Sequence, residues 1–188
     1  GNYIVNGAGT FEIKKANITV KPKDITKVYG SEPAFALESN SPLITEQELE
    51  TFANSAIFTC SGAAKNAPVT ATGYEISAQL TDSETNNLIL MVDGTGTLTV
   101  VPKALTVTVN DVSRIYGEPN PELSVSYEGF IEGENESVLN GTLVLAYDNR
   151  INETAPVGLH ENVTTASGLT SENYDITYVP GNVTITKI

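Results

Sequence analysis

The sequence predicts a mostly β protein with some helix (α+β), built from two tandem repeats. Thr, Asn, Val and Gly are abundant in the 188 residues, and this composition is typical of strands joined by many turns. Apolar and polar residues alternate with a period of two in several short runs, as they do in half-buried strands. Four landmarks recur in the same order about 87 residues apart, which indicates two copies of one scaffold.

The landmarks define where each repeat begins and ends. They are the pairs Ile18-Thr19-Val20 and Leu105-Thr106-Val107, Tyr29-Gly30 and Tyr116-Gly117, Ala67-Pro68-Val69 and Ala155-Pro156-Val157, and 96–100 and 181–185. We therefore expect repeat 1 to occupy residues 16–102 and repeat 2 to occupy residues 103–188. Residues 1–15 resemble the end of a repeat. We interpret them as the closing hairpin of a truncated preceding repeat, and the chain as a slice of a longer tandem array.

A Tyr-Gly turn occurs once in each repeat. Its residues are Tyr29, Gly30 and Pro33 in repeat 1, and Tyr116, Gly117 and Pro119 in repeat 2. Gly permits a backbone conformation that other residues resist, and Pro ends a strand. A Tyr ring can pack a turn onto a core while its hydroxyl keeps a polar partner. We expect both turns to be structural, with buried tyrosine rings.

The order of elements favours a β-grasp-like fold for each repeat. In repeat 2 we expect strands at 105–112, 123–129, 142–147 and 160–166, a helical turn at 134–140, and a closing hairpin of 174–179 and 183–187 across residues 180–182. In repeat 1, Thr45 and Glu48 have the spacing of a capping box at a helix start, and 57–60 is the next strand. One helix lying across a mixed sheet would bury the alternating apolar faces. The alternative is an immunoglobulin-like β-sandwich.

Charge and reactive residues argue against several function classes. The net charge of −13 opposes binding to nucleic acid and direct contact with an anionic membrane. The single His, His160, has no evident catalytic partners, so we expect no enzyme activity and no cofactor. The single Cys, Cys60, follows a strand-like run and is expected to be a core thiol. The acidic stretches 82–87 and 132–136 lack the spacing of a Ca²⁺ loop.

Several motifs of repeat 2 resemble the MBG-type repeats (the YGX kind) of bacterial surface proteins. These motifs are the Ala-Leu-Thr-Val-Thr-Val start at 104–109, the Ile-Tyr-Gly-Glu-Pro-Asn-Pro turn at 115–121, the Gly-Phe-Ile-Glu-Gly-Glu segment at 129–134, and the ending from Asn173-Tyr174 to 181–185. Repeat 1 fits with departures, namely Ser31 before Glu-Pro and a longer helix. The resemblance implies a non-enzymatic stalk or spacer of an extracellular adhesin, whose partners are neighbouring repeats of the same chain.

The alternative function is that a repeat itself binds a host glycan or protein. Sugar sites usually stack a sugar ring on an exposed aromatic side chain, and the chain has no Trp. Tyr127, Tyr147 and Tyr178 are the possible ligand contacts. Each lies at an expected strand position, where packing against a neighbouring strand is the simpler explanation.

Overall fold

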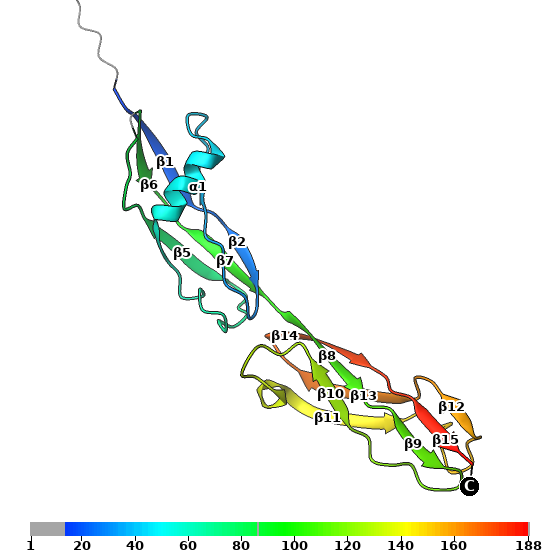
Figure 1. Cartoon of the computed structure of the whole chain (residues 1–188). Helices are drawn as coiled ribbons and strands as arrows, with labels where there is room; N and C mark the ends of the chain where they lie inside the picture. Colours follow the sequence, from blue (N-terminus) through cyan, green and yellow to red (C-terminus); the bar gives the residue numbers. More distant parts are fainter. Residues whose placement is uncertain (1–13, 86, 188) are drawn as a thin grey trace, which may run out of the picture. The chain divides into compact units, whose positions relative to one another are not determined.

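The computed structural model describes residues 14–85 and 87–187 (Figure 1). The mostly β class with mixed sheets and one short α-helix is confirmed for this part of the chain. The described residues form two compact units: unit 1 contains 14–25, 33–63 and the described part of 74–98, and unit 2 contains 26–32, 64–73 and 99–187. Three segments of repeat 1, namely 26–32, 64–73 and 99–102, therefore belong to unit 2. The hairpin expected near the N-terminus lies outside the described residues.

Unit 1 combines two sheets with one helix. In the first sheet, β1 (Ala16–Pro22) lies between β3 (Leu37–Glu38), which is antiparallel to it, and β6 (Leu88–Val92), which is parallel. The second sheet has the order β2 (Ile25–Val28), β7 (Gly96–Val101), β5 (Tyr74–Gln79), β4 (Ile57–Thr59). Both β2 and β7 begin in unit 1 and end in unit 2.

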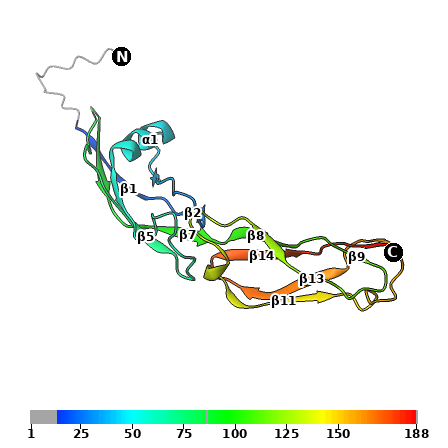
Figure 2. The ribbon, with the colours of Figure 1, turned by 60° about the horizontal axis from the view of Figure 1, so that its bottom comes forward.

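The helix α1 (Glu46–Ser55) begins at the predicted capping box. The backbone N–H of Glu48 donates to Thr45 Oγ1 (3.3 Å), and the backbone N–H of Thr45 donates to Glu48 Oε2 (2.9 Å). These donors hold the pKa of Glu48 below its ordinary value. Leu49 and Phe52 are buried against Ile18 and other residues of β1, β3 and β6, so α1 lies on one face of β1 (Figure 2). No helix in the described residues is long and apolar enough to cross a membrane.

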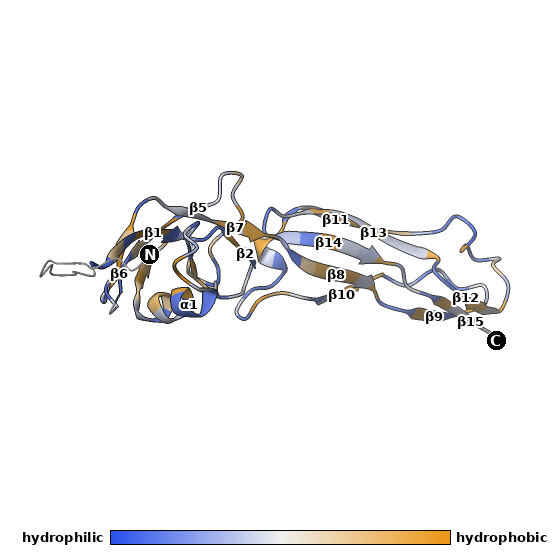
Figure 3. Cartoon of the chain, turned by 90° about the horizontal axis from the view of Figure 1, so that it is seen from above, coloured by the Kyte–Doolittle hydropathy of each residue, from blue (hydrophilic) through white to orange (hydrophobic). Residues whose placement is uncertain are grey.

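Unit 2 contains three small sheets. The strand β8 (Lys103–Val109) pairs antiparallel with β10 (Val125–Glu128) and parallel with β14 (Tyr174–Val179). The strand β11 (Asn140–Tyr147) pairs antiparallel with β13 (Thr164–Thr170), and β15 (Val183–Thr186) lies between β12 (Gly158–His160) and β9 (Val112–Ile115). Figure 2 shows β8 and β14 in one layer and β11 and β13 in another. The apolar character of β8 (Figure 3) reflects the burial of its alternate residues, Leu105, Val107 and Val109.

The two repeats share a strand pairing that supports their common origin. The first strand of each pairs parallel with a late strand: Ala16 is opposite Leu88 in the β1–β6 ladder, and Lys103 is opposite Tyr174 in the β8–β14 ladder. Parallel neighbours need a crossover connection, and in each repeat the intervening strands and helical segment provide it. The two sequence copies therefore share this parallel pairing, although their remaining strands are grouped into different sheets.

The closing hairpin predicted for repeat 2 is wrong. The strand β14 pairs with β8, whereas β15 pairs with β9 and β12 in a different sheet. The connection between them packs closely on the end of β8, since a Cβ at Gly181 would overlap the carbonyl of Val109. The backbone N–H of Val112 then donates to the carbonyl of Asn182 (3.0 Å). The chain thus crosses from one sheet to the next at Gly181 instead of folding back.

Other predicted elements of repeat 2 are displaced or divided. The strand expected at 160–166 is split, because the chain leaves β12 at His160, turns at Asn162 with φ +54°, and enters β13 at Thr164. The strand expected at 105–112 is divided between β8 and β9, and the helical turn at 134–140 is a 3₁₀ turn, η1 (Glu136–Val138). In repeat 1, Cys60 lies just after β4 and is half-buried, so it is not the core thiol that was expected.

The buried face of β7 can be tested with a matched pair of leucines. The side chain of Leu98 is 0% exposed, whereas that of Leu43 is 61% exposed. Leu98→Ala should lower the free energy of unfolding by about 2–5 kcal/mol, because it removes buried apolar atoms and leaves a cavity. Leu43→Ala should change it by less than about 0.5 kcal/mol. Chemical denaturation measures both, and equal stabilities of the two variants would contradict this core.

Candidate functional site: the two tyrosine-glycine turns

The Tyr29 turn (residues 28–31) follows β2 and belongs to unit 2. The backbone N–H of Tyr29 donates to the carbonyl of Val101 at the end of β7 (2.9 Å), and the N–H of Ser31 closes the turn on the carbonyl of Val28 (3.0 Å). Gly30 has φ +89°, a conformation that side chains with a Cβ rarely adopt. Its N–H donates to the carbonyl of Lys65 (2.9 Å).

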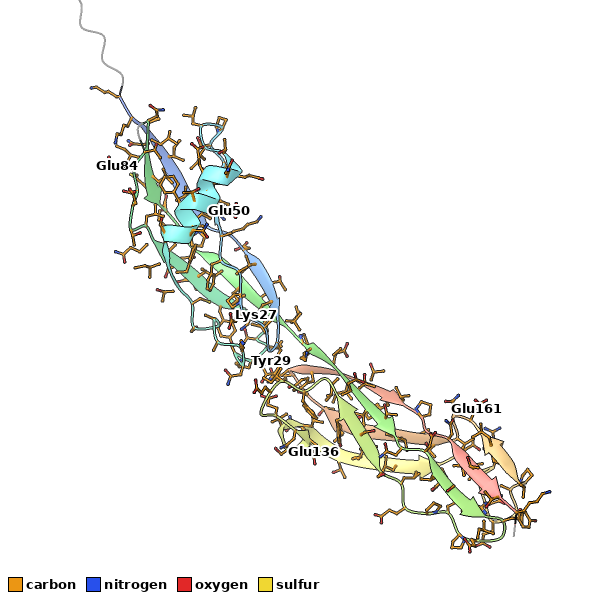
Figure 4. All side chains as sticks on the ribbon, viewed as in Figure 1. Lys27, Tyr29, Glu50, Glu84, Glu136 and Glu161 are labelled. Atoms are coloured by element: carbon orange, nitrogen blue, oxygen red, sulfur yellow. The ribbon has the colours of Figure 1, made fainter. Side chains whose placement is uncertain are left out.

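A buried lysine, Lys27, connects this turn to the Ala-Pro loop. The side chain of Lys27 is 4% exposed, and its Nζ donates to the carbonyl of Ala64. The same carbonyl accepts from the backbone N–H of Ala67 (3.0 Å). Figure 4 shows Lys27 and Tyr29 at neighbouring positions of this segment. Lys27, two positions before Tyr29, is therefore bound by the loop that carries the repeated Ala-Pro landmark.

The ring of Tyr29 packs into an aromatic cluster of unit 2. It is 3% exposed, as is Tyr174 at the start of β14. The two rings meet edge to face, with centroids 5.4 Å apart and an interplanar angle of 81°. Tyr174 meets Phe130 in the same way at 5.3 Å and 82°. Such edge-to-face pairs stabilise beyond the burial of their area, so the cluster stabilises the position of the turn.

Glu134 satisfies the hydroxyl groups of both buried tyrosines. The Tyr29 hydroxyl donates to Glu134 Oε1 and the Tyr174 hydroxyl donates to Glu134 Oε2, each at 2.6 Å. The Tyr174 oxygen also accepts from the backbone N–H of Ile131 (3.0 Å). Burial and the hydrogen bond to Glu134 raise the pKa of Tyr29 and raise that of Tyr174 to about 12. Both hydroxyls are therefore protonated donors at neutral pH.

Two further contacts hold the same region together. A Cβ at Gly30 would overlap the Ile131 side chain, so the turn has no room for a larger residue. The backbone N–H of Val69, after the Ala-Pro loop, donates to Asn173 Oδ1 (2.9 Å). The carbonyl of Asn173 accepts from the N–H of Lys103 (3.0 Å). Asn173 thus binds the 64–73 loop through its side-chain amide, and Tyr174 packs its ring against Tyr29 of the turn.

The Tyr116 turn (residues 115–118) repeats the local structure of the Tyr29 turn. The N–H of Tyr116 donates to the carbonyl of Thr186 (2.9 Å), the N–H of Glu118 donates to the carbonyl of Ile115 (3.2 Å), and Gly117 has φ +86°. Arg114 lies two residues before Tyr116, as Lys27 lies two residues before Tyr29, and it is 6% exposed.

Arg114 also binds its Ala-Pro loop as Lys27 does. Its Nη2 donates to the carbonyl of Asn152, which accepts from the N–H of Ala155 as well (3.0 Å). Arg114 Nε donates to Asn120 Oδ1 (2.9 Å). Each turn is therefore preceded by a buried cation that donates to a carbonyl of the neighbouring Ala-Pro loop.

The surroundings of the two turns differ. Tyr116 is 40% exposed, and apart from Gly117 and its two chain neighbours, no described residue has an atom within 4 Å of the place where Gly117 would carry a Cβ. The prediction of a buried Tyr116 ring is therefore wrong, because within the described residues it lacks the partners that Tyr29 has in Tyr174 and Glu134. Pro33 is half-buried and Pro119 is exposed.

The three tyrosines named as possible ligand contacts are half-buried and engaged in packing. Tyr127 packs against Phe130 with centroids 5.6 Å apart. The Tyr178 hydroxyl donates to the carbonyl of Leu169 (3.1 Å) and accepts from its N–H (2.8 Å). The Tyr147 hydroxyl donates to the carbonyl of Pro121 (2.7 Å), and its ring packs in a separate cluster near Ile151 and Val163. The structure does not gather all three around one cavity.

Other reactive groups are dispersed. His160 Nε2 lies 2.8 Å from the carbonyl of Pro156. Within residues 14–85 and 87–187, no group of three or more His, Cys, Asp or Glu side chains could hold a metal ion.

Sequence reasoning missed the two partners of Tyr29. The sequence predicts Glu134 in an acidic stretch and at the start of a helical turn, and Tyr174 in the first strand of a closing hairpin. Both lie in motifs that carry the family resemblance, at 129–134 and 173–174. Their meeting could not be foreseen, because about 40 residues separate them and the predicted hairpin placed Tyr174 beside the wrong strand.

The architecture described above is mostly β, with a Tyr-Gly turn and an Ala-Pro loop that occur twice in the chain. The family model described as MBG domain (YGX type) matches residues 105–184, which confirms the resemblance over repeat 2. This family is a non-catalytic repeat type. A comparison with curated proteins gives no significant match.

The tyrosine cluster predicts a distinctive alkaline titration. Because the folded pKa values of Tyr29 and Tyr174 lie above the unfolded value of about 10, their neutral hydroxyls stabilise the fold fully below pH 10. That stability is lost as the pH rises toward 12 and beyond. Ultraviolet absorbance should show a late tyrosine ionisation that coincides with unfolding, and Tyr29→Phe and Tyr174→Phe should each reduce its amplitude. Titration of all eight tyrosines together near pH 10 in the folded protein would contradict the cluster.

Proposed function

We propose that this chain is a non-enzymatic spacer of a bacterial cell-surface or secreted adhesin, in which tandem repeats hold a distal binding domain away from the cell. One observation carries the proposal: the Tyr29 turn and the 64–73 loop of repeat 1 are part of the same compact unit as repeat 2. A spacer needs each repeat to be stabilised by its neighbour, and repeats that contact their neighbours form stable arrays. The match of residues 105–184 to a repeat-type family supports this role.

The backbone around Pro102 is suited to a stiff connection. Pro102 alone separates β7 from β8, and proline restricts both itself and the residue before it to extended geometry. The carbonyl of Val101 accepts from Tyr29 and the N–H of Lys103 donates to Asn173. With hydrogen bonds on both sides and no glycine, this segment is unlike a flexible Gly-rich linker.

The charge of the chain fits an exposed location. A net charge of −13 favours solubility and opposes self-association. We therefore propose an extracellular location, which the family match supports, with neighbouring repeats as partners and no contact with nucleic acid or membrane.

Direct binding of a host glycan or protein is the second candidate function. One groove on unit 2 favours it, lined by Leu143, Leu145 and Tyr147 of β11 together with Pro121, Glu122 and Leu123. An apolar wall with a nearby carboxylate could receive one face of a sugar ring. Glycan-array binding that is abolished by Leu145→Ser, with an unchanged fold, would favour this function over a spacer.

The spacer proposal predicts an extended particle in solution. A single globule of 188 residues would have a radius of gyration of about 16 Å, whereas two repeats of about 12 Å with centres about 40 Å apart would give roughly 23 Å. Small-angle X-ray scattering should give the larger value, and the compact value would contradict a spacer.

A flexible insertion provides the control for stiffness. A Gly-Ser-Gly-Ser segment between Pro102 and Lys103 should broaden the distribution of distances in the scattering curve, because it releases the backbone that Pro102 restricts. An unchanged distribution would mean that the native connection is already flexible.

A further inference from the structure

The two Tyr-Gly turns provide an internal comparison between an occupied and an unoccupied docking element. In both turns the backbone N–H of the tyrosine donates to a carbonyl at 2.9 Å, that of Val101 for Tyr29 and that of Thr186 for Tyr116. Both glycines have φ near +90°. Tyr29 is 3% exposed, whereas Tyr116 is 40% exposed. The same local structure is thus packed against neighbouring side chains in one copy and open in the other.

The open copy also exposes the groups that correspond to the remaining docking contacts. Val157 corresponds to Val69 in the repeated Ala-Pro-Val landmark and is 44% exposed. The N–H of Val69 is bound by Asn173, and the landmark predicts the same use for the N–H of Val157. Ile115, beside Tyr116, is 40% exposed. Since Arg114 binds the turn's own loop through the carbonyl of Asn152, the exposed side chains Ile115, Tyr116 and Val157 belong to one turn-and-loop unit.

We propose that the Tyr116 turn and the 155–157 loop form a docking surface for a further module of the same repeat class, following in the same polypeptide. The occupant is defined by its chemistry. It presents an Asn-Tyr pair and a glutamate, as residues 173–174 and 134 do for the Tyr29 turn. Its glutamate accepts from the Tyr116 hydroxyl, its tyrosine packs on the Tyr116 ring, and its asparagine side chain accepts from the Val157 N–H.

The carboxylate explains why this surface selects a related repeat over an arbitrary apolar partner. A tyrosine hydroxyl that is removed from water needs an acceptor, and in the occupied copy that acceptor is Glu134 at 2.6 Å. A partner without a carboxylate at this position leaves the Tyr116 hydroxyl unsatisfied. Gly117 also selects the partner by shape. In the Tyr29 turn the Ile131 side chain fills the space where Gly30 would carry a Cβ, and Gly117 leaves the same space for an equivalent side chain of the partner.

The test extends the full chain by one repeat. A second copy of residues 103–188 is joined directly after Lys187, since the N–H of Tyr116 binds Thr186 as that of Tyr29 binds Val101. Hydrogen exchange of the Val157 amide is then compared in the extended and the original chain. Docking predicts that exchange slows at least about ten-fold on extension. An unchanged rate, with the added copy folded by its own amide protection, overturns the proposal.

Two glycine variants of the extended chain distinguish docking from general stability. Gly117 and Gly133 both have φ +86°, and no described residue beyond their chain neighbours has an atom within 4 Å of the Cβ position. Gly117→Ala should restore fast exchange at Val157, whereas Gly133→Ala in the same repeat should leave the slow exchange unchanged. Equal effects of the two variants would contradict a docking surface at Gly117.

A second experiment needs no added repeat. The turns Val28-Tyr29-Gly30-Ser31 and Ile115-Tyr116-Gly117-Glu118 differ at two positions, so Val28→Ile with Ser31→Glu places the second turn's sequence on the known docking contacts. If the Tyr116 turn can dock, the Val69 amide should retain its protection within about two-fold. Loss of that protection would overturn the proposal.

The docking proposal rests on the proposed spacer function, but the two fail differently. A compact particle in scattering rejects the spacer without changing exchange at Val69 or Val157. Unchanged exchange at Val157 in the extended chain rejects docking at Tyr116 while leaving the scattering result intact.

Discussion

The hydrogen bonds that Glu134 accepts from Tyr29 and Tyr174 are the interaction on which the rest of the site depends. Two phenolic hydroxyls that leave water need acceptors, and one carboxylate supplies both because its two oxygens point to different rings. The position of Tyr29 then requires a glycine next to it, since Ile131 fills the space where a Cβ would lie. It also places the 64–73 loop where the Asn173 amide can bind Val69.

The cation below each turn is the second constraint. Lys27 and Arg114 are among the most buried charged residues of the described chain, and a buried charge must be paired or hydrogen-bonded to be tolerated. Each donates to a carbonyl of the loop that carries the Ala-Pro landmark. The combination of turn, buried cation and loop therefore occurs twice, with lysine as the cation in one copy and arginine in the other. This unit exists in both copies, so the difference between the turns comes from their surroundings.

The sequence predicted the parts of this fold that local chemistry determines. Thr45 and Glu48 define the start of α1 because a capping box needs only a spacing of three residues. The period-two runs located β8 and β10 to within a few residues. Residues 174–187 were misread as a hairpin, since a Pro-Gly turn between two strands does not reveal that each strand pairs in parallel with a partner far away in sequence. The burial of Tyr29 and the exposure of Tyr116 likewise depend on distant residues, which identical local motifs cannot distinguish.

The central claim is that Glu134 and Tyr29 stabilise the chain jointly, and a double-mutant cycle tests it most directly. The free energy of unfolding is measured for the parent chain, Tyr29→Phe, Glu134→Ala and the double variant. A direct hydrogen bond predicts a coupling energy of about 0.5–3 kcal/mol, because the second substitution costs little once the first has removed the bond. A Tyr116→Phe and Glu134→Ala cycle serves as the control and should give a coupling near zero. Strictly additive effects of Tyr29→Phe and Glu134→Ala would contradict the account.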